Sequence, residues 1–190
     1  CTPDYLLQFA YMGKYYAQSV LSIDEPRIAL LNIGTEETKG TDLQRQAYAL
    51  LREAGGRGEL NFIGNIEARE VTFGECDVVV TDGYSGNILL KAIEGYGTLL
   101  MKEMKAMFLK SGKTKIAAAL LKDGLDSFKS KYSASGVGGT AMLGISKPVI
   151  KAHGSSKAEA VCSAIGQAIN TARVDVPARI KAHLETVKES

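Results

Sequence analysis

The chain has 190 residues, 45% of them hydrophobic and 23% charged, and a formal net charge of +2 at pH 7. These values are typical of one soluble globular domain, and so small a charge argues against a nucleic-acid binder. The cysteines Cys1, Cys76 and Cys162 are far apart, no CxxC pair occurs, and only two histidines are present. This pattern excludes a zinc module and predicts free thiols in a reducing compartment. Because no apolar run approaches the roughly 18–20 residues of a spanning helix and no signal peptide is evident, we expect a cytoplasmic protein.

The first predicted element is a helix over residues 1–20. Pro3 suits a first helical turn, and an apolar stripe follows it at Leu6, Leu7, Ala10 and Tyr11. Because the chain begins at Cys1 and immediately enters this helix, we expect it to be the carboxy-terminal part of a longer chain.

Strands and helices alternate along the rest of the sequence. Strands are predicted at residues 27–34, 59–65 and 76–82, with an amphipathic helix at 41–54 that opens on a Thr41–Gln44 capping box. Helices are predicted at 88–110, softly broken by two glycines, and at 115–131, 155–172 and 176–189, with short apolar runs at 138–145 and 147–154. The alternation predicts a single α/β domain over residues 1–190, with a Rossmann-like, mainly parallel sheet and helices on both faces.

Three glycine-rich junctions connect predicted strands to helices, at residues 32–41, 82–87 and 151–159. The last includes a second possible capping box, Ser156 with Glu159. Ligands of open α/β sheets bind beyond the carboxyl ends of strands, where helix N-termini favour anions. The junctions would together form a cleft rich in hydrogen-bond donors. Its candidate substrate-binding residues are Asn32, Gly34, Thr35, Gly40, Asp82, Gly83, Ser85, Gly86, Gly154, Ser155 and Ser156.

Each junction also has a simpler explanation. Tight turns need glycine, Lys39 alone is typical of a solvated surface lysine, His153 alone of a hydrogen-bonded structural residue, and Asp82 of a helix cap. Three such junctions in one domain, carrying one lysine and one histidine, favour an anion or phosphate site. The order Lys-Gly-Thr at residues 39–41 differs from a P-loop, and no GxGxxG follows a strand. Nucleotide cofactors are therefore disfavoured, no cofactor is expected, and a small anion such as inorganic phosphate remains.

Five blocks in order carry a family resemblance: residues 32–43, 61–71, 76–91, 138–144 and 149–156. The chain resembles the bacterial acyl-(acyl carrier protein):phosphate acyltransferase family over nearly its whole length. The resemblance implies transfer of a fatty acyl group from acyl carrier protein to inorganic phosphate, giving acyl phosphate for phospholipid synthesis. It also implies a fold similar to isocitrate and isopropylmalate dehydrogenases, a homodimer, and peripheral association with the membrane. The family's Asp-Ala-Met-Gly-Gly-Asp block does not occur here, so we expect part of the substrate cleft to come from a missing amino-terminal half.

The resemblance implies three catalytic residues: Lys39, Asn87 and His153. Lys39 could neutralise one phosphate charge, helped by N–H groups at the Gly40 and Gly86 turns. Asn87 could stabilise the oxyanion of the tetrahedral intermediate, and His153 could bind phosphate or transfer a proton.

Residues 97–131 predict a protruding, basic amphipathic helical hairpin. Residues 101–131 hold eight lysines against three acidic residues, a local balance of 8 − 3 = +5. The hairpin could be two ordinary amphipathic helices with a solvated lysine face. Alternatively, it could contact an anionic membrane surface or the acidic acyl carrier protein. Two other functions stay open: a phosphate acetyl- or butyryltransferase that uses acyl-CoA, and a catalytically incomplete fragment that binds anions and docks on membranes.

Overall fold

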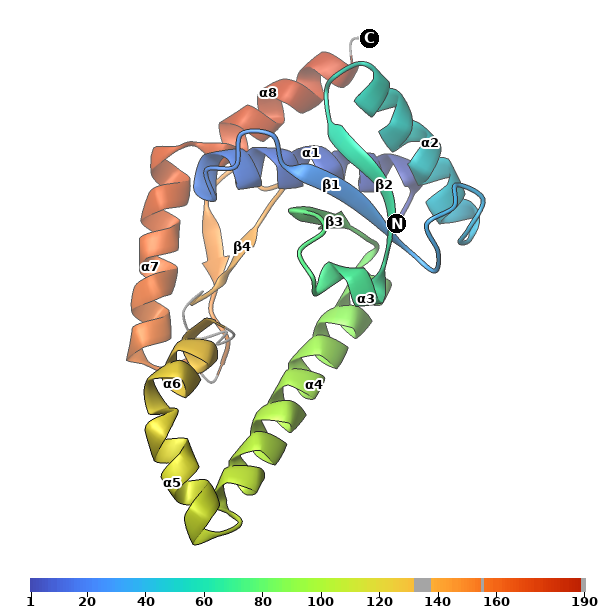
Figure 1. Cartoon of the computed structure of the whole chain (residues 1–190). Coiled ribbons are helices and arrows are strands. Elements are labelled where there is room, and N and C mark those ends of the chain that lie inside the picture. Colours follow the sequence, from blue (N-terminus) through green and yellow to red (C-terminus); the bar gives the residue numbers. More distant parts are fainter. Residues whose placement is uncertain (132–137, 155, 189–190) are drawn as a thin grey trace.

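The computed structural model describes residues 1–131, 138–154 and 156–188 (Figure 1). The amino-terminal elements are α1 (Pro3–Val20), β1 (Arg27–Asn32), α2 (Asp42–Gly56), β2 (Asn61–Glu67), α3 (Ala68–Val71) and β3 (Val78–Val80). The central helices are α4 (Gly83–Leu109), α5 (Gly112–Leu120) and α6 (Lys122–Lys131). The carboxy-terminal elements are β4 (Thr140–Met142), β5 (Val149–Lys151), α7 (Ala158–Arg173) and α8 (Val176–Lys188).

The first three strands form a parallel sheet in the order β2-β1-β3. Leu30 of β1 stands opposite Asn65 of β2 on one side and Val80 of β3 on the other. The α/β class and the mainly parallel sheet are therefore confirmed. β4 and β5 form a separate antiparallel pair, so the two carboxy-terminal apolar runs do not join the parallel sheet.

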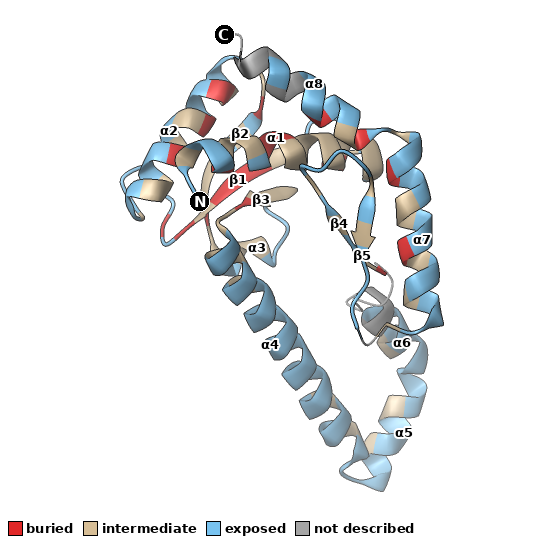
Figure 2. Cartoon of the chain, turned by 180° about the vertical axis from the view of Figure 1, so that it is seen from behind, coloured by how far each residue is buried: buried red, intermediate tan, exposed pale blue. Residues whose placement is uncertain are grey.

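The main core lies between this sheet and a layer made by α1 and α2 (Figure 2). Leu6 and Tyr11 of α1 meet Ile28 and Leu30 of β1 and Leu51 of α2, and all five are almost fully buried. Each large apolar side chain buried in this way stabilises the fold by about 1.5–3 kcal/mol. The helix predicted at residues 1–20 is confirmed, including the apolar stripe that packs on the sheet.

Hydrogen bonds that involve side chains cap the starts of α1 and α2. The Thr2 side chain accepts a hydrogen bond from the Tyr5 backbone N–H at 3.3 Å, and Pro3 occupies the first helical turn. The Thr41 backbone N–H donates to Oε1 of Gln44 at 3.1 Å, as the predicted capping box requires.

The expected cover on both faces of the parallel sheet is not seen within the described residues. α1 and α2 pack against each other on one face, and Figure 1 shows no described helix in front of the other. α8 packs against α1, where the Arg179 guanidinium lies 5.4 Å from the centre of the Tyr15 ring. α7 packs instead on the β4–β5 pair.

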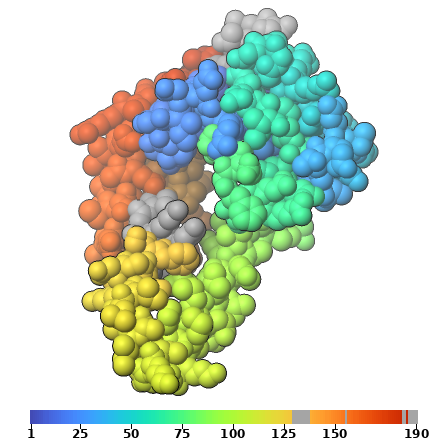
Figure 3. Space-filling view, in the orientation of Figure 1, coloured from blue at the N-terminus to red at the C-terminus, as the bar shows by residue number. Residues whose placement is uncertain are grey.

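α4 differs from its predicted form because it begins earlier and continues without a break. It starts at Gly83, with only Thr81 and Asp82 between it and β3, and passes through Gly95 and Gly97 to Leu109. A glycine in a helix costs only about 1 kcal/mol relative to alanine, which the surrounding Leu, Met, Lys and Glu residues offset. Figures 1 and 3 show α4 projecting from the sheet, and in Figure 1 α5 and α6 run back from its far end at an angle and diverge from it.

Two smaller elements also differ from the sequence prediction. The helix predicted at 115–131 is divided into α5 and α6 at Leu121, whose ψ of 7° leaves the helical region. Lys-Asp-Gly follows directly, and both aspartate and glycine are poor helix formers. The single turn α3 was not predicted, because four residues are too few to show a helical period.

Candidate functional site

The loop after β1 is fixed by Asn32, the last residue of that strand. Asn32 is only 8% exposed, and both polar atoms of its side chain are used. Its Oδ1 accepts a hydrogen bond from the Ile33 backbone N–H at 2.8 Å, and its Nδ2 donates to the Lys39 carbonyl at 3.1 Å. Asn32 therefore shapes the loop through its side chain.

Gly40 permits this closed loop. Its φ is +89°, a conformation that residues with a Cβ rarely adopt. A Cβ at this position would lie 2.6 Å from Oδ1 of Asn32 and 2.8 Å from Cβ of Gln44. Of the neighbouring loop residues, Gly34 is buried, whereas Thr35 and Lys39 are exposed. The loop thus presents the Lys39 side chain to solvent from a well-defined backbone.

The junction after β3 is a helix cap with its first turn. Oδ1 of Asp82 accepts hydrogen bonds from the backbone N–H groups of Tyr84 and Ser85, each at 2.9 Å. These hydrogen bonds, those from Ser85 first, lower the pKa of Asp82 below its usual value. The capping explanation for Asp82 is the one that the structure supports.

The cap also changes what Gly86 can do. Its N–H donates to the Asp82 carbonyl at 3.0 Å, so the Gly86 N–H is engaged within the helix. Gly86 serves packing instead, because a Cβ there would lie 2.6 Å from Cγ2 of Thr81. Gly83 and Asn87 are exposed on the first turns of α4, and Ser85 is half-buried.

The structure brings two of the three junctions to one edge. β1 and β3 are adjacent and parallel, so the Lys39 loop and the start of α4 both leave the carboxyl edge of the same sheet. The third junction follows β5 in the other sheet, and His153 and Gly154 are exposed there. Ser155 lies outside the described residues. Of the three junctions, two therefore leave the same sheet edge, and the third leaves a different sheet.

The predicted capping box at Ser156 was also wrong. α7 begins at Ala158, its N-cap residue is Lys157, and no side-chain hydrogen bond caps it. The Ser156 N–H instead donates to the His153 carbonyl at 2.9 Å, which closes a turn before the helix.

The sequence of this chain matches a known protein family. The family model described as "Fatty acid synthesis protein" matches residues 1–179. The chain belongs to this family. Its family resemblance, drawn from five sequence blocks, is thereby confirmed.

Curated relatives of the fatty acid synthesis protein family carry the name phosphate acyltransferase. The protein of Oceanobacillus iheyensis is 46% identical over 185 residues, which cover 97% of this chain and 54% of the relative. That of Listeria monocytogenes is 45% identical, with 98% and 54% covered, and that of Thermoanaerobacterium thermosaccharolyticum is 43% identical, with 98% and 55% covered. The chain spans about half the length of these relatives.

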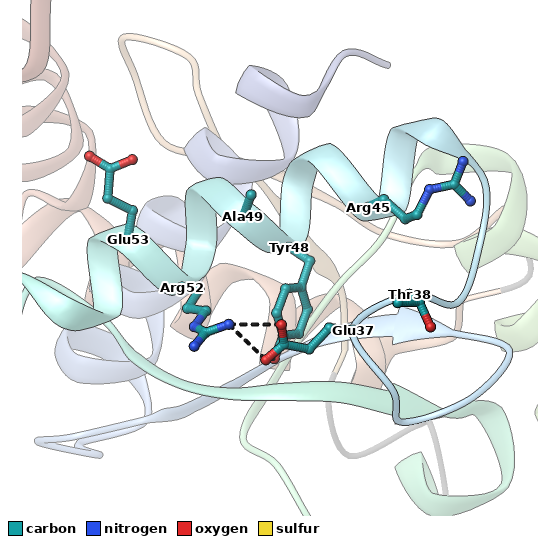
Figure 4. Close-up of a pocket in the computed structure, with 7 residues that line it drawn as sticks. All are labelled: Glu37, Thr38, Arg45, Tyr48, Ala49, Arg52 and Glu53. Atoms are coloured by element: carbon teal, nitrogen blue, oxygen red, sulfur yellow. Dashed lines mark hydrogen bonds and ion pairs between the residues drawn. The ribbon is translucent and has the colours of Figure 1, made fainter.

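A cavity of about 540 Å³ lies between the Lys39 loop and the outer face of α2 (Figure 4). It contains none of the predicted catalytic residues. Nη1 of Arg52 donates to both carboxylate oxygens of Glu37, at 2.8 and 2.7 Å, across this cavity. Its charges are thus paired within the protein, and it is not the candidate site. The lining residues are Glu37, Thr38, Arg45, Tyr48, Ala49, Arg52 and Glu53.

Sequence reasoning missed one residue of the site, Asn65 of β2. Its Nδ2 donates to the Glu36 carbonyl in the Lys39 loop at 2.9 Å. The available signal was an asparagine inside an apolar strand, where this residue type is depleted. Within the described part of the chain, no group of His, Cys, Asp and Glu side chains is arranged to hold a metal, and no helix has the length and apolar character to cross a membrane.

Proposed function

We propose that this protein takes part in the transfer of a fatty acyl group from acyl carrier protein to inorganic phosphate. A phosphate oxygen attacks the thioester carbonyl, the carbon–sulfur bond breaks, and the thiolate takes up a proton to leave as a thiol. The product is an acyl phosphate for phospholipid synthesis. The relatives' name, phosphate acyltransferase, supports the reaction class, and the choice of acyl carrier protein as donor is our own.

The observation that carries the proposal is the shared edge of β1 and β3. It combines an exposed lysine on a fixed loop with the start of a long helix. Phosphate is a modest nucleophile whose main requirement is to be held in line with the carbonyl carbon. Lys39 supplies positive charge for this, at the same edge as the start of α4, where Asp82 caps the first free N–H groups.

Asn87 is the candidate donor to the oxyanion. It lies in the second turn of α4 and is exposed, whereas Asp82 is already engaged in capping that helix. An amide that is fixed on a helix can donate a hydrogen bond to the carbonyl oxygen as negative charge develops there. Removal of one such donor typically lowers kcat by 10²–10³.

His153 completes the proposed set as a phosphate ligand or proton carrier. The two ring nitrogens of an imidazole can accept and donate protons, which suits transfer of a proton to the departing thiolate. Its junction follows β5 rather than a strand of the parallel sheet. The proposal therefore requires the site to extend from the carboxyl edge of the sheet to the turn before α7.

The basic segment formed by α4, α5 and α6 supports a large or membrane-bound acyl source. It exposes long apolar side chains among its lysines, with Leu120 83% exposed, Ile116 65% and Met107 55%. Apolar side chains flanked by lysines suit an anionic membrane surface. We propose that residues 97–131 dock this protein peripherally on the cytoplasmic face of the membrane, as a single α/β domain within a homodimer. The same basic charge could receive the acidic carrier protein.

Two other functions would look different in an assay. A phosphate acetyl- or butyryltransferase would prefer acyl-CoA, a soluble donor that needs no membrane-facing segment. A catalytically incomplete fragment would bind phosphate without turnover. The second alternative follows from the chain's coverage of about half of its relatives.

The test is phosphate-dependent thiol release from palmitoyl-acyl carrier protein. Lys39→Ala and Asn87→Ala are compared with Lys181→Ala, an exposed lysine of α8 whose Nζ lies 3.7 Å from a Glu185 carboxylate oxygen. We expect both site variants to lose at least 100-fold in rate, and the control to retain full rate because exposed ion pairs contribute little.

The outcomes separate the three functions. Faster release from short acyl-CoA than from palmitoyl-acyl carrier protein favours the CoA enzyme. Phosphate binding without release favours the fragment, and the assay is then repeated with the family's amino-terminal half supplied. Continued absence of turnover contradicts the proposed function.

A further inference from the structure

Asn65, near the carboxyl end of β2, contacts the loop that carries Lys39. Its Nδ2 donates to the carbonyl of Glu36 at 2.9 Å. The same carbonyl accepts the backbone N–H of Lys39 at 3.1 Å. The Glu36 oxygen is therefore the point at which β2 and the Lys39 backbone meet.

The other side of the Lys39 peptide is also fixed. Nδ2 of Asn32 donates to the Lys39 carbonyl at 3.1 Å. Both backbone polar groups of Lys39 are thus bonded, one through Glu36 and one directly to Asn32. Only the rotamers of the lysine side chain remain free to change the place of its ammonium group.

The chemistry of Asn65 shows which of its atoms matters. Asparagine is depleted in strands, and its Oδ1 here is shielded from solvent with no hydrogen-bond partner among the described residues. An unpaired buried acceptor destabilises a fold, and an apolar side chain at this position would avoid that penalty. The Asn65 side chain therefore serves through its Nδ2, which donates a hydrogen bond to the Lys39 loop.

We propose that Asn65 is a positioning residue that fixes the Lys39 backbone for binding of inorganic phosphate. The inference rests on the proposed function of Lys39. Asn65 reaches phosphate only through the loop, because its donor is directed to the Glu36 carbonyl. Loss of this donor leaves the Glu36–Lys39 turn held from the loop side alone, so the ammonium group samples more positions and phosphate binds more weakly.

A second asparagine on the same strand serves as a matched control that separates a purely structural role of Asn65 from a role in positioning Lys39. Nδ2 of Asn61, at the opposite end of β2, donates to the Glu25 carbonyl at 3.3 Å. Both asparagines tie β2 to a backbone carbonyl of a preceding loop. Only the Asn65 bond reaches the loop of Lys39, so any difference between Asn65→Ser and Asn61→Ser reports on that loop.

The first measurement is hydrogen exchange of the Lys39 amide by NMR, in the 190-residue chain and in both variants. Loss of one hydrogen bond changes a local equilibrium by about fivefold, so we expect Asn65→Ser to speed this exchange by about that factor. Asn61→Ser should leave it unchanged. Circular dichroism melting confirms folding, and Asn65→Thr, with its higher strand propensity, replaces the serine variant if that variant does not fold.

The second measurement is phosphate affinity by ³¹P NMR titration with inorganic phosphate. Asn65→Ser should weaken binding by about fivefold, but should have no further effect in a Lys39→Met background, because it acts through Lys39. Equal weakening in both backgrounds, or unchanged exchange of the Lys39 amide, would overturn the inference. Absence of phosphate binding by the unsubstituted chain would instead overturn the proposed function, while the exchange data still decide whether Asn65 fixes Lys39.

Discussion

Substitution of Gly40 by alanine tests whether the Lys39 loop has the closed form described above. Gly40 has a φ of +89°, so the new side chain requires a conformation that costs an L-residue roughly 1–2 kcal/mol. The added Cβ would also lie 2.6 Å from Oδ1 of Asn32, closer than real contacts allow. Asn32 must then move and release the Lys39 carbonyl, which costs about 1 kcal/mol more.

We therefore expect Gly40→Ala to lower the free energy of unfolding by about 2–3 kcal/mol. For a chain of this length that corresponds to a decrease in Tm of roughly 4–12 °C. Urea denaturation followed by circular dichroism measures the free energy, and phosphate-dependent thiol release measures the effect on Lys39. The variant should still fold, but its activity should fall, because the substitution opens the loop that carries Lys39.

Gly58→Ala is the matched control for the backbone contribution. Gly58 also has a positive φ, +73°, but a Cβ there would meet nothing within 4 Å. It should lose only the conformational part, about 1–2 kcal/mol, and keep full activity. Equal losses of stability in the two variants, with equal activity, would refute the clash with Asn32 and the closed form of the loop.

Three further predictions concern parts of the fold that support the site. Asp82→Ala should destabilise the protein by about 1 kcal/mol at pH 7 in urea denaturation, because the cap of α4 is lost. The pKa of Asp82 is lowered in the folded state, so its contribution to stability is complete above the unfolded pKa of about 4 and is lost as the pH falls through the lower, folded value. The difference in unfolding free energy between the protein and the variant should therefore disappear in acid, and a difference that stays constant with pH would contradict the cap. Leu51→Ala should cost about 2–5 kcal/mol in the same assay, since Leu51 is fully buried between α2 and the sheet, and a loss under 1 kcal/mol would contradict this core. Arg179→Ala should cost roughly 0.5–1 kcal/mol, because the guanidinium that joins α8 to the Tyr15 ring is removed, and an unchanged melting curve would contradict that contact.

Periodicity predicted the elements that pack locally in the sequence. The apolar stripe of α1 and the alternation of apolar strands with α2 predicted the parallel sheet and its main helix layer. The partner of β5 could not be predicted in this way. β5 contains only two apolar residues, Val149 and Ile150. So short a strand shows too little of an alternating pattern to indicate that it pairs with β4, just before it in the chain, rather than with the parallel sheet.

Glycine was the least reliable signal in the chain. Gly95 and Gly97 predicted a soft break in the helix, yet α4 is continuous through both, because the local cost is small against 27 helical residues. Gly40, by contrast, does mark a special backbone conformation. The residue type, glycine, is the same at Gly40 as at Gly95 and Gly97. What differs is whether the surrounding segment holds the chain at positive φ, and that is set by Asn32 and Asn65, which lie on neighbouring strands.

The same ambiguity separates the two junctions of the candidate site. A helix cap and an anion site use the same residue types, because both satisfy free N–H groups at a helix N-terminus. At α4 the protein's own carboxylate, Asp82, occupies two of these groups, so an incoming phosphate would meet a helix end that already carries negative charge. In the proposed function positive charge then comes mainly from Lys39, whose backbone is held from two strands. If this reasoning is right, Asp82→Asn should bind phosphate at least as well as the unsubstituted chain in a ³¹P NMR titration, because the neutral amide oxygen can still cap α4. A clear loss of affinity would show that the carboxylate itself is needed for the site.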